Sequence, residues 1–220
     1  MAPDNQTRLG ILFDMDGVLV GSNPVHKEVI RAFCTRHGKN ISESFFLESI
    51  SGRTNREWIP LIFPDKSIPE IDRLADEKEQ LFRETFDPAA AVTPGLLEFI
   101  KELRSNRIPM AVATSAPEEN AVFILEKLRI TSCFDAVLHA AHVSRGKPHP
   151  EIYIKSARAI GLEPAQCVVF EDSVAGVTAG RKAGARVIGV TGTHTREELG
   201  ACIRVIASFE EIAFTDLMQL

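Results

Sequence analysis

The stretch "ILFDMDGVLV", residues 11–20, ends an apolar run in two aspartates that are two positions apart. Residues 10–15 predict a buried strand, and Gly17 allows the chain to turn directly after it. In an extended backbone Asp14 and Asp16 point to the same side, where like charges repel and raise one another's pKa. The rest of the chain must therefore supply positive charge near this strand end.

Strand and helix patterns alternate from about residue 93 to the C-terminal region. Short apolar segments predict further strands at 110–114, 135–140, 167–172, 186–191 and 204–208. Helical patterns lie between them, at 93–108, 118–129, 150–161 and 173–184. In the first of these helices Thr93 is expected to be the cap and Pro94 the start. The alternation predicts an α/β fold with a Rossmann-like parallel sheet covered on both faces.

The segment after the first strand has a different pattern, because it contains helical periodicity and no convincing strand. Its longest helical pattern covers residues 67–86. The segment is too long for an ordinary connection. We therefore expect an inserted α-helical cap domain at 23–89, with the core domain formed by 1–22 and 90–220. Two crossing points would let such a cap close over a site.

The composition excludes several classes of protein. The formal net charge is -5 and no basic run is present, which argues against a nucleic-acid partner. No apolar run approaches the roughly 20 residues of a membrane span. The N-terminal residues have neither the apolar nor the arginine-rich pattern of a targeting segment. These features indicate a soluble, cytoplasmic protein, which we expect to be a monomer.

Polar side chains follow three of the predicted strands. Besides the aspartate pair, they are Thr114, Ser115, Glu171 and Asp172. The carboxyl ends of parallel strands meet at one edge of the sheet, where ligands bind. Up to four carboxylates would then share one crevice, and a hard divalent cation such as Mg²⁺ would relieve their repulsion. Lys147, in a loop with Gly and Pro on either side, is the candidate lysine of this site.

This set of groups suits phosphoryl transfer. A carboxylate can attack phosphorus and form an aspartyl-phosphate. A second carboxylate can protonate the leaving group and later activate water. A cation and a lysine would spread the charge of the phosphate.

Four segments, "FDMDGVLV", "VATSAP", "GKPHPE" and "VVFEDSVAGVTAG", resemble the ordered motifs of the haloacid dehalogenase-like (HAD) superfamily. The resemblance is closest to its β-phosphoglucomutase-like branch, with a helical cap between the first two motifs. It implies that Asp14 is the nucleophile and Asp16 the general acid/base. An acid at position 16 argues against the dehalogenase and phosphonatase branches.

The resemblance also implies the remaining roles at the core site. Thr114 and Lys147 would contact the phosphate and the nucleophile. The Mg²⁺ ligands would be Asp14, the backbone carbonyl of Asp16, Asp172 and Glu171.

Some residues outside the core motifs resemble substrate contacts of this branch. His26 lies ten residues after Asp16, where mutase-like members carry a cap histidine. The segment "SGRTNRE" resembles the substrate loop, and it gives Gly52, Arg53 and Thr54 as candidate contacts beside Ser115 of the core. The mutase pattern has arginine at position 55 and an acid at position 21. Here they are Asn55 and Gly21, which favours a phosphatase.

The sequence therefore predicts a Mg²⁺-dependent phosphatase that acts on a small phosphorylated metabolite, a sugar or polyol phosphate. Two alternatives stay open. The first is a β-phosphoglucomutase-type phosphotransferase. The second is a HAD-like fold that serves as a non-catalytic binding module.

Overall fold

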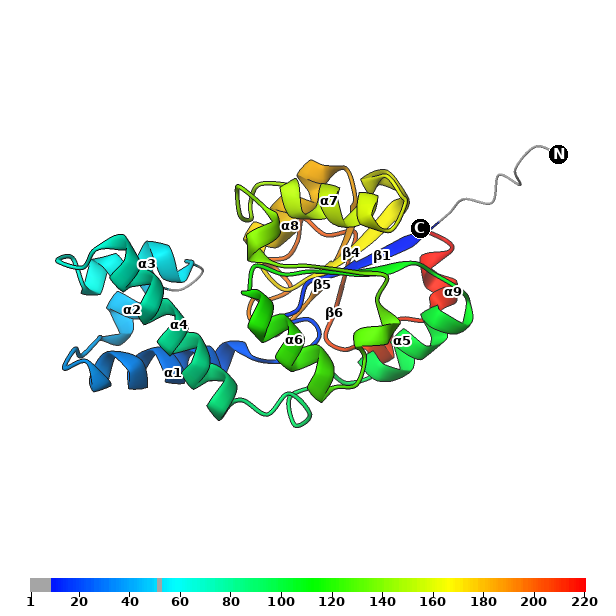
Figure 1. The fold of residues 1–220 in the computed structure, drawn as a ribbon. Helices are drawn as coiled ribbons and strands as arrows, with labels where there is room; N and C mark the ends of the chain where they lie inside the picture. The colour runs from blue at the N-terminus through cyan, green and yellow to red at the C-terminus, as the bar shows by residue number, and fades with distance from the viewer. Residues whose placement is uncertain (1–8, 51–52) are drawn as a thin grey trace. The chain divides into compact units, whose positions relative to one another are not determined.

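The computed structural model describes residues 9–50 and 53–220, which form two compact units (Figure 1). The first unit joins the segment that ends at Ser22 to Pro88–Leu220. The second unit is Asn23–Asp87. Each unit is described by itself below.

A six-stranded parallel sheet in the order β3-β2-β1-β4-β5-β6 forms the centre of the first unit. The strands are β1 Gly10–Phe13, β2 Met110–Ala113, β3 Ala136–Leu138, β4 Cys167–Glu171, β5 Arg186–Val190 and β6 Arg204–Ile206. The chain builds outward from β1 on one side and then continues from β4 on the other. The carboxyl ends of β1 and β4 therefore lie at the point where the strand order reverses, which is where ligands bind in such sheets. The predicted α/β, Rossmann-like core is confirmed.

Helices cover both faces of this sheet, with α7 and α8 on one face and α5 and α6 on the other (Figure 1). The α-helices of the unit are α5 Leu96–Ser105, α6 Glu118–Lys127, α7 Glu151–Ala159, α8 Val174–Ala183 and α9 Phe214–Leu217. Short 3₁₀ turns lie at Thr131–Cys133, Ala140–His142, Pro164–Gln166 and Phe209–Glu211. The alternating strands and helices follow the sequence pattern closely, with element ends that differ by a few residues.

The core side chains fix β1 between its neighbours. On the α7–α8 face, Leu12 belongs to a buried aliphatic cluster with Val169. On the other face, the rings of Phe13 and Phe170 stack with centroids 5.3 Å apart, and Phe99 of α5 packs edge-on against both. Because both faces of β1 are packed, the position of the polar residues that follow it is set by the core.

The predicted start of α5 is wrong. The helix begins at Leu96, and the residue before it is Gly95, whose φ of 77° is in the left-handed region. Thr93 is not its cap. The Thr93 hydroxyl donates to the carbonyl oxygen of Val18 at 2.7 Å, and its backbone N–H donates to the carbonyl oxygen of Leu19 at 3.1 Å.

Thr93 is part of a longer connection between two segments of the first unit. Val20 and Val92 form an isolated antiparallel bridge, and the N–H of Gly21 donates to the carbonyl oxygen of Ala91 at 2.8 Å. The chain therefore leaves the core and returns to it along two segments that are hydrogen-bonded to each other.

The second unit is helical throughout its described residues. Its helices are α1 Asn23–Arg36, α2 Glu43–Ser49, α3 Asn55–Ile62 and α4 Ile68–Thr85. Buried aromatic side chains join them: Trp58 of α3 packs edge-on against Phe33 of α1, and Phe82 of α4 is fully buried. Among the described residues of the chain, no helix combines the length and apolarity that a bilayer crossing requires.

Candidate active site

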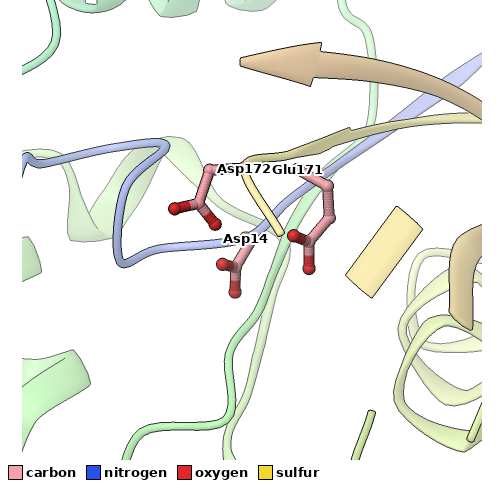
Figure 2. Close-up of side chains that lie close together, drawn as sticks. All are labelled: Asp14, Glu171 and Asp172. Atoms are coloured by element: carbon pink, nitrogen blue, oxygen red, sulfur yellow. The ribbon is translucent and has the colours of Figure 1, made fainter. Parts of the chain in front are cut away.

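Three buried carboxylates converge where β1 and β4 end (Figure 2). Asp14 follows β1, Glu171 is the last residue of β4, and Asp172 comes next. One oxygen from each lies within 4.8 Å of the others. The core thus places three acids from two distant segments in one small volume.

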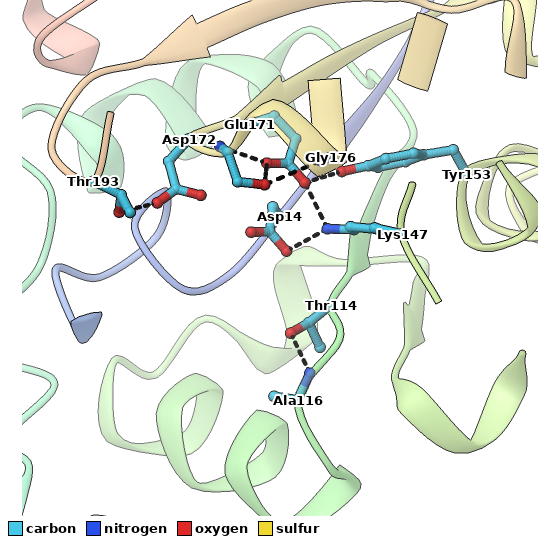
Figure 3. Close-up of polar contacts among 10 residues, drawn as sticks. Asp14, Thr114, Ala116, Lys147, Tyr153, Glu171, Asp172, Gly176 and Thr193 are labelled. Carbon is cyan, nitrogen blue, oxygen red and sulfur yellow. Dashed lines mark hydrogen bonds and ion pairs between the residues drawn. The ribbon is translucent and has the colours of Figure 1, made fainter. Parts of the chain in front are cut away.

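Lys147 supplies the countercharge that the sequence requires (Figure 3). Its ammonium nitrogen lies 2.7 Å from Asp14 Oδ1 and 2.6 Å from Glu171 Oε1. The lysine side chain is only 8% exposed. This burial makes the two ion pairs much less screened than pairs at the surface.

The four charges shift one another's pKa. Burial raises the pKa of Asp14 well above its ordinary value, and Glu171 and Asp172 add to this, while Lys147 opposes it. Burial, helped by Glu171, raises the pKa of Asp172 to about 7. Glu171 differs, because Lys147 and the hydrogen bonds to its carboxylate outweigh burial and lower its pKa. The pKa of Lys147 is raised by the acids despite its burial.

The residues present fit a hard divalent cation. The donor set of Asp14, Glu171 and Asp172 is all oxygen, and one lysine does not balance three carboxylates. Mg²⁺ takes such oxygen ligands at one or two carboxylates and completes its shell with water and phosphate. A cation here would reduce the repulsion that raises the pKa values of the two aspartates.

Asp16 lies beside this group and is held by a hydroxyl. The turn after it depends on Gly17, whose φ is 81°. Ser22 Oγ donates to Asp16 Oδ1 at 2.5 Å. The Asp16 carboxylate is not a member of the three-acid group within the described chain. Its predicted contribution to a metal is the backbone carbonyl, which stays a prediction.

Thr114 and Ser115 follow β2, the strand next to β1. Thr114 is buried, and its hydroxyl accepts a hydrogen bond of 3.0 Å from the N–H of Ala116. Ser115 is exposed. The structure therefore brings these residues to the same sheet edge as the acids, as the strand-end argument predicts.

The Tyr153 and Thr193 side chains also touch the acids, and sequence reasoning missed both (Figure 3). The Tyr153 hydroxyl donates to Glu171 Oε1 at 2.7 Å. The Thr193 hydroxyl donates to Asp172 Oδ2. Thr193 follows β5, so the strand-end rule could have found it. Tyr153 lies within the apolar pattern of α7, which carries no signal of a polar role.

Gly176 leaves the space in which the Glu171 carboxylate lies. A Cβ atom at this position would be 1.7 Å from Glu171 Oε1. In the sequence, Gly176, Gly180 and Gly184 are four residues apart, which indicates close packing of the helix on the sheet, and the first two positions fit that interpretation. Gly184 does not, because a Cβ there would meet nothing within 4 Å; its φ of 91° instead ends α8 in the left-handed conformation.

The remaining predicted substrate contacts belong to the second unit. His26 stacks on the ring of Phe82 with centroids 3.9 Å apart. Thr54 is the N-cap of α3 and shares a capping box with Glu57. Arg53 is exposed, and Gly52 lies outside the described residues.

The haloacid dehalogenase-like hydrolase family model matches residues 11–190. Among curated proteins, validoxylamine A 7'-phosphate phosphatase from Streptomyces hygroscopicus subsp. limoneus is 33% identical over 91% of this chain and 94% of its own. Phosphorylated carbohydrates phosphatase from Thermotoga maritima is 34% identical, covering 82% of this chain and 84% of its own.

Solved structures give the same result. A HAD hydrolase, family IA, variant 3 from Entamoeba histolytica has a TM-score of 0.87 at 29% identity, covering 96% of this chain and 99% of that one. A β-phosphoglucomutase from Clostridium difficile has a TM-score of 0.82 at 28% identity, covering 96% and 95%. The chain therefore belongs to the haloacid dehalogenase-like hydrolase family, as an enzyme of its phosphatase class.

Proposed function

We propose that the chain hydrolyses a small phosphorylated metabolite, a sugar or polyol phosphate, with Mg²⁺ and through an aspartyl-phosphate on Asp14. The observation that carries the proposal is the convergence of three buried carboxylates, two of which contact Lys147; its ammonium lies 2.7 Å from Asp14 and 2.6 Å from Glu171. A structural ion pair needs one acid for one lysine. Three acids at the strand-order reversal suit a site that binds a cation and an anionic ester.

In the proposed reaction, Asp14 attacks phosphorus with a carboxylate oxygen. The bond from phosphorus to the ester oxygen breaks, and Asp16 donates a proton to the departing oxygen. Water then attacks the aspartyl-phosphate while Asp16 accepts a proton, which releases inorganic phosphate and restores Asp14. Lys147 and Thr114 hold the phosphate oxygens and the nucleophile in place.

Asp14, Asp172 and the backbone carbonyl of Asp16 would hold the Mg²⁺ ion, with Glu171 as the third carboxylate of the group. When bound, the ion supplies charge neutralisation that lets an anionic carboxylate approach an anionic ester.

Both curated relatives described above are named as phosphatases, and the name of the Thermotoga maritima protein specifies phosphorylated carbohydrates, which supports a sugar or polyol phosphate as the substrate class. Residues 23–89 are proposed as a cap domain that selects the substrate. Its contacts would come from His26, Gly52, Arg53 and Thr54, together with Ser115 of the core.

A β-phosphoglucomutase-type transfer is the second candidate, because a mutase of that name shares the fold. A mutase must bind a second phosphate group of its substrate. The mutase pattern has an arginine for this at position 55, where this chain has Asn55. The Asn55 amide donates to Glu79 Oε1 at 2.7 Å, and its oxygen accepts from Trp58 Nε1 at 3.1 Å. This side chain is engaged within the helical unit, which favours hydrolysis.

One screen tests the proposal. The purified protein is assayed for phosphate release from a panel of phosphorylated metabolites with Mg²⁺, and Asp14→Asn is the control. We expect the wild type to release phosphate from sugar or polyol phosphates and the Asp14→Asn variant to release none. Supplying β-glucose 1-phosphate with a trace of the 1,6-bisphosphate tests the mutase, since rapid formation of glucose 6-phosphate with little free phosphate would favour transfer.

A further inference from the structure

Glu171 has a full set of protein hydrogen bonds. Its carboxylate is 0% exposed. Oε1 accepts from Lys147 at 2.6 Å and from the Tyr153 hydroxyl at 2.7 Å. Oε2 accepts from both the backbone N–H and the hydroxyl of Ser173, each at 3.0 Å. A carboxylate offers about four acceptor positions, so these four donors fill it.

Tyr153 contacts this group in two ways. Its hydroxyl bonds to Glu171, and its ring centroid lies 5.0 Å from the Lys147 nitrogen, within the range of a cation–π contact. The side chain is completely buried on α7. Tyr153 therefore limits the positions open to both members of the ion pair.

We propose that Tyr153 is a positioning residue, which together with Glu171 holds the Lys147 ammonium against Asp14, and that Glu171 supports the lysine instead of binding the metal. The inference rests on the proposed function, because the lysine is positioned for phosphoryl transfer. The geometry supports it directly, since a metal that bound Glu171 would have to displace one of four donors. Asp14 and Asp172 then remain as the carboxylate ligands.

The first test is Tyr153→Phe, which keeps the ring beside Lys147 and removes only the hydroxyl. Loss of a hydrogen bond to a charged group predicts a fall in kcat of about 10-fold or more. We expect KM to stay within about two-fold, because the completely buried Tyr153 side chain offers substrate no accessible surface. This split between kcat and KM separates positioning from a general loss of folded protein.

Ser156→Ala is the matched control. Ser156 lies on the same helix, is fully buried, and its hydroxyl has no hydrogen-bond partner among the described residues. Its removal should leave kcat unchanged. A Tyr153→Phe enzyme as fast as the Ser156→Ala enzyme would overturn the positioning role.

The second test separates a lysine support from a metal ligand without using activity. Mn²⁺ binding to the substrate-free protein is measured by electron paramagnetic resonance for Glu171→Gln, Asp172→Asn and Tyr153→Phe. We expect Asp172→Asn to weaken Mn²⁺ binding at least about 10-fold more than Glu171→Gln. The first substitution removes a carboxylate ligand of the metal, whereas the second removes only a nearby negative charge. Tyr153→Phe should bind Mn²⁺ as the wild type does. Equal losses for the two acid variants would overturn the assignment of Glu171.

The third test uses the fact that Tyr153 is the only tyrosine of the chain. Labelling with 3-fluorotyrosine gives a single ¹⁹F resonance, which should move in Glu171→Gln and stay in Glu118→Gln, a change at an exposed residue of α6. Neither this test nor Mn²⁺ binding needs a substrate. If the wild type hydrolysed no phosphate ester, the proposed function would be wrong. The ¹⁹F and Mn²⁺ measurements would still test the contact between Tyr153 and Glu171 and the assignment of Glu171. A ¹⁹F chemical shift that is the same in Glu171→Gln as in the wild type would overturn the inference itself.

Discussion

Lys147 and Asp14 form a buried ion pair of 2.7 Å although 133 positions of sequence separate them. The pair connects the loop before α7 to the end of β1, so it forms only when the chain brings these two distant segments together at the edge of the sheet. The candidate nucleophile Asp14 therefore depends on Lys147, a cationic side chain that is distant in the sequence, and the predictions below for the site follow from this dependence.

Asp14→Asn should abolish turnover and leave the protein folded. An amide cannot form the phosphoenzyme, but its oxygen can still accept the hydrogen bond from Lys147. We expect kcat to fall by at least about 100-fold, with a far-ultraviolet circular dichroism spectrum like that of the wild type. Retention of more than about one hundredth of kcat would exclude covalent catalysis through this residue.

Asp16→Asn should slow the reaction most for esters with poor leaving groups. An alkoxide needs a proton as it departs, whereas p-nitrophenolate hardly does. The measurement compares kcat on a sugar phosphate with kcat on p-nitrophenyl phosphate. Equal losses on both esters would remove Asp16 from the role of general acid.

Lys147→Met should destabilise the metal-free protein. The change leaves buried acids without their cation, and breaking a buried ion pair costs about 3–5 kcal/mol of unfolding free energy. Urea unfolding at pH 7 measures this loss, and added Mg²⁺ should recover more stability in the variant than in the wild type. Lys155→Met is the control. Its partner Glu151 is also a carboxylate, but the Lys155 side chain is 48% exposed, so the loss should stay below about 1 kcal/mol.

Gly176→Ala should disrupt the site, although alanine is the better helix former by about 1 kcal/mol. The new Cβ would overlap the Glu171 carboxylate, which must then move and release Lys147. We expect losses of both kcat and unfolding free energy. At Gly180 the nearest atom to a new Cβ is a side-chain methyl of Val187 at 2.8 Å. Gly180→Ala should therefore change stability and spare kcat, and the same kcat for both variants would argue against the predicted clash.

Glu79→Gln tests a buried polar network of the helical unit. Burial pushes the pKa of Glu79 upward, but Lys78 at 2.8 Å and Asn55 at 2.7 Å outweigh it and hold the pKa below its ordinary value of 4.5. Because the folded-state pKa is lowered, this stabilisation is present above about pH 4.5 and is lost as the pH falls through the folded-state pKa. The wild type should therefore be more stable than Glu79→Gln at pH 6, and the difference should narrow below pH 4.5. A gap in unfolding free energy that is constant from pH 6 to pH 3 would contradict the shift.

Local sequence signals were sufficient for the strands and for the acids at their ends. Asp14 and Asp172 could be placed at one edge because parallel strands carry their carboxyl ends together, whatever the intervening chain does. Lys147 followed from its Gly- and Pro-flanked loop and from the motif resemblance. Its distance to Asp14 could not be predicted, because it depends on how the loop before α7 packs in three dimensions.

The wrong prediction for Thr93 and the missed contact of Tyr153 also have their cause in three-dimensional packing. Thr93 and Pro94 have the composition of a helix start, yet tertiary hydrogen bonds to Val18 and Leu19 take Thr93 away from that role. Tyr153 was missed because its ring satisfies the apolar helix pattern, while only its hydroxyl oxygen contacts the site. Such contacts between side chains from distant segments have no period that a sequence could display.

The hydrogen bond between Gly21 and Ala91 makes the helical insertion a separable module. Since the two junctions are already hydrogen-bonded to each other, a short turn would be enough to connect them and keep the chain of the core continuous. Doubling the length of a loop with fixed ends costs only about 0.6 kcal/mol, so the inserted segment can be shortened, extended or exchanged with little effect on core stability. A variant that replaces the helical unit by a glycine-rich turn should still unfold cooperatively. Under the proposed role of the insertion, a lineage that changed it would alter substrate choice while the acids at the sheet edge stayed in place.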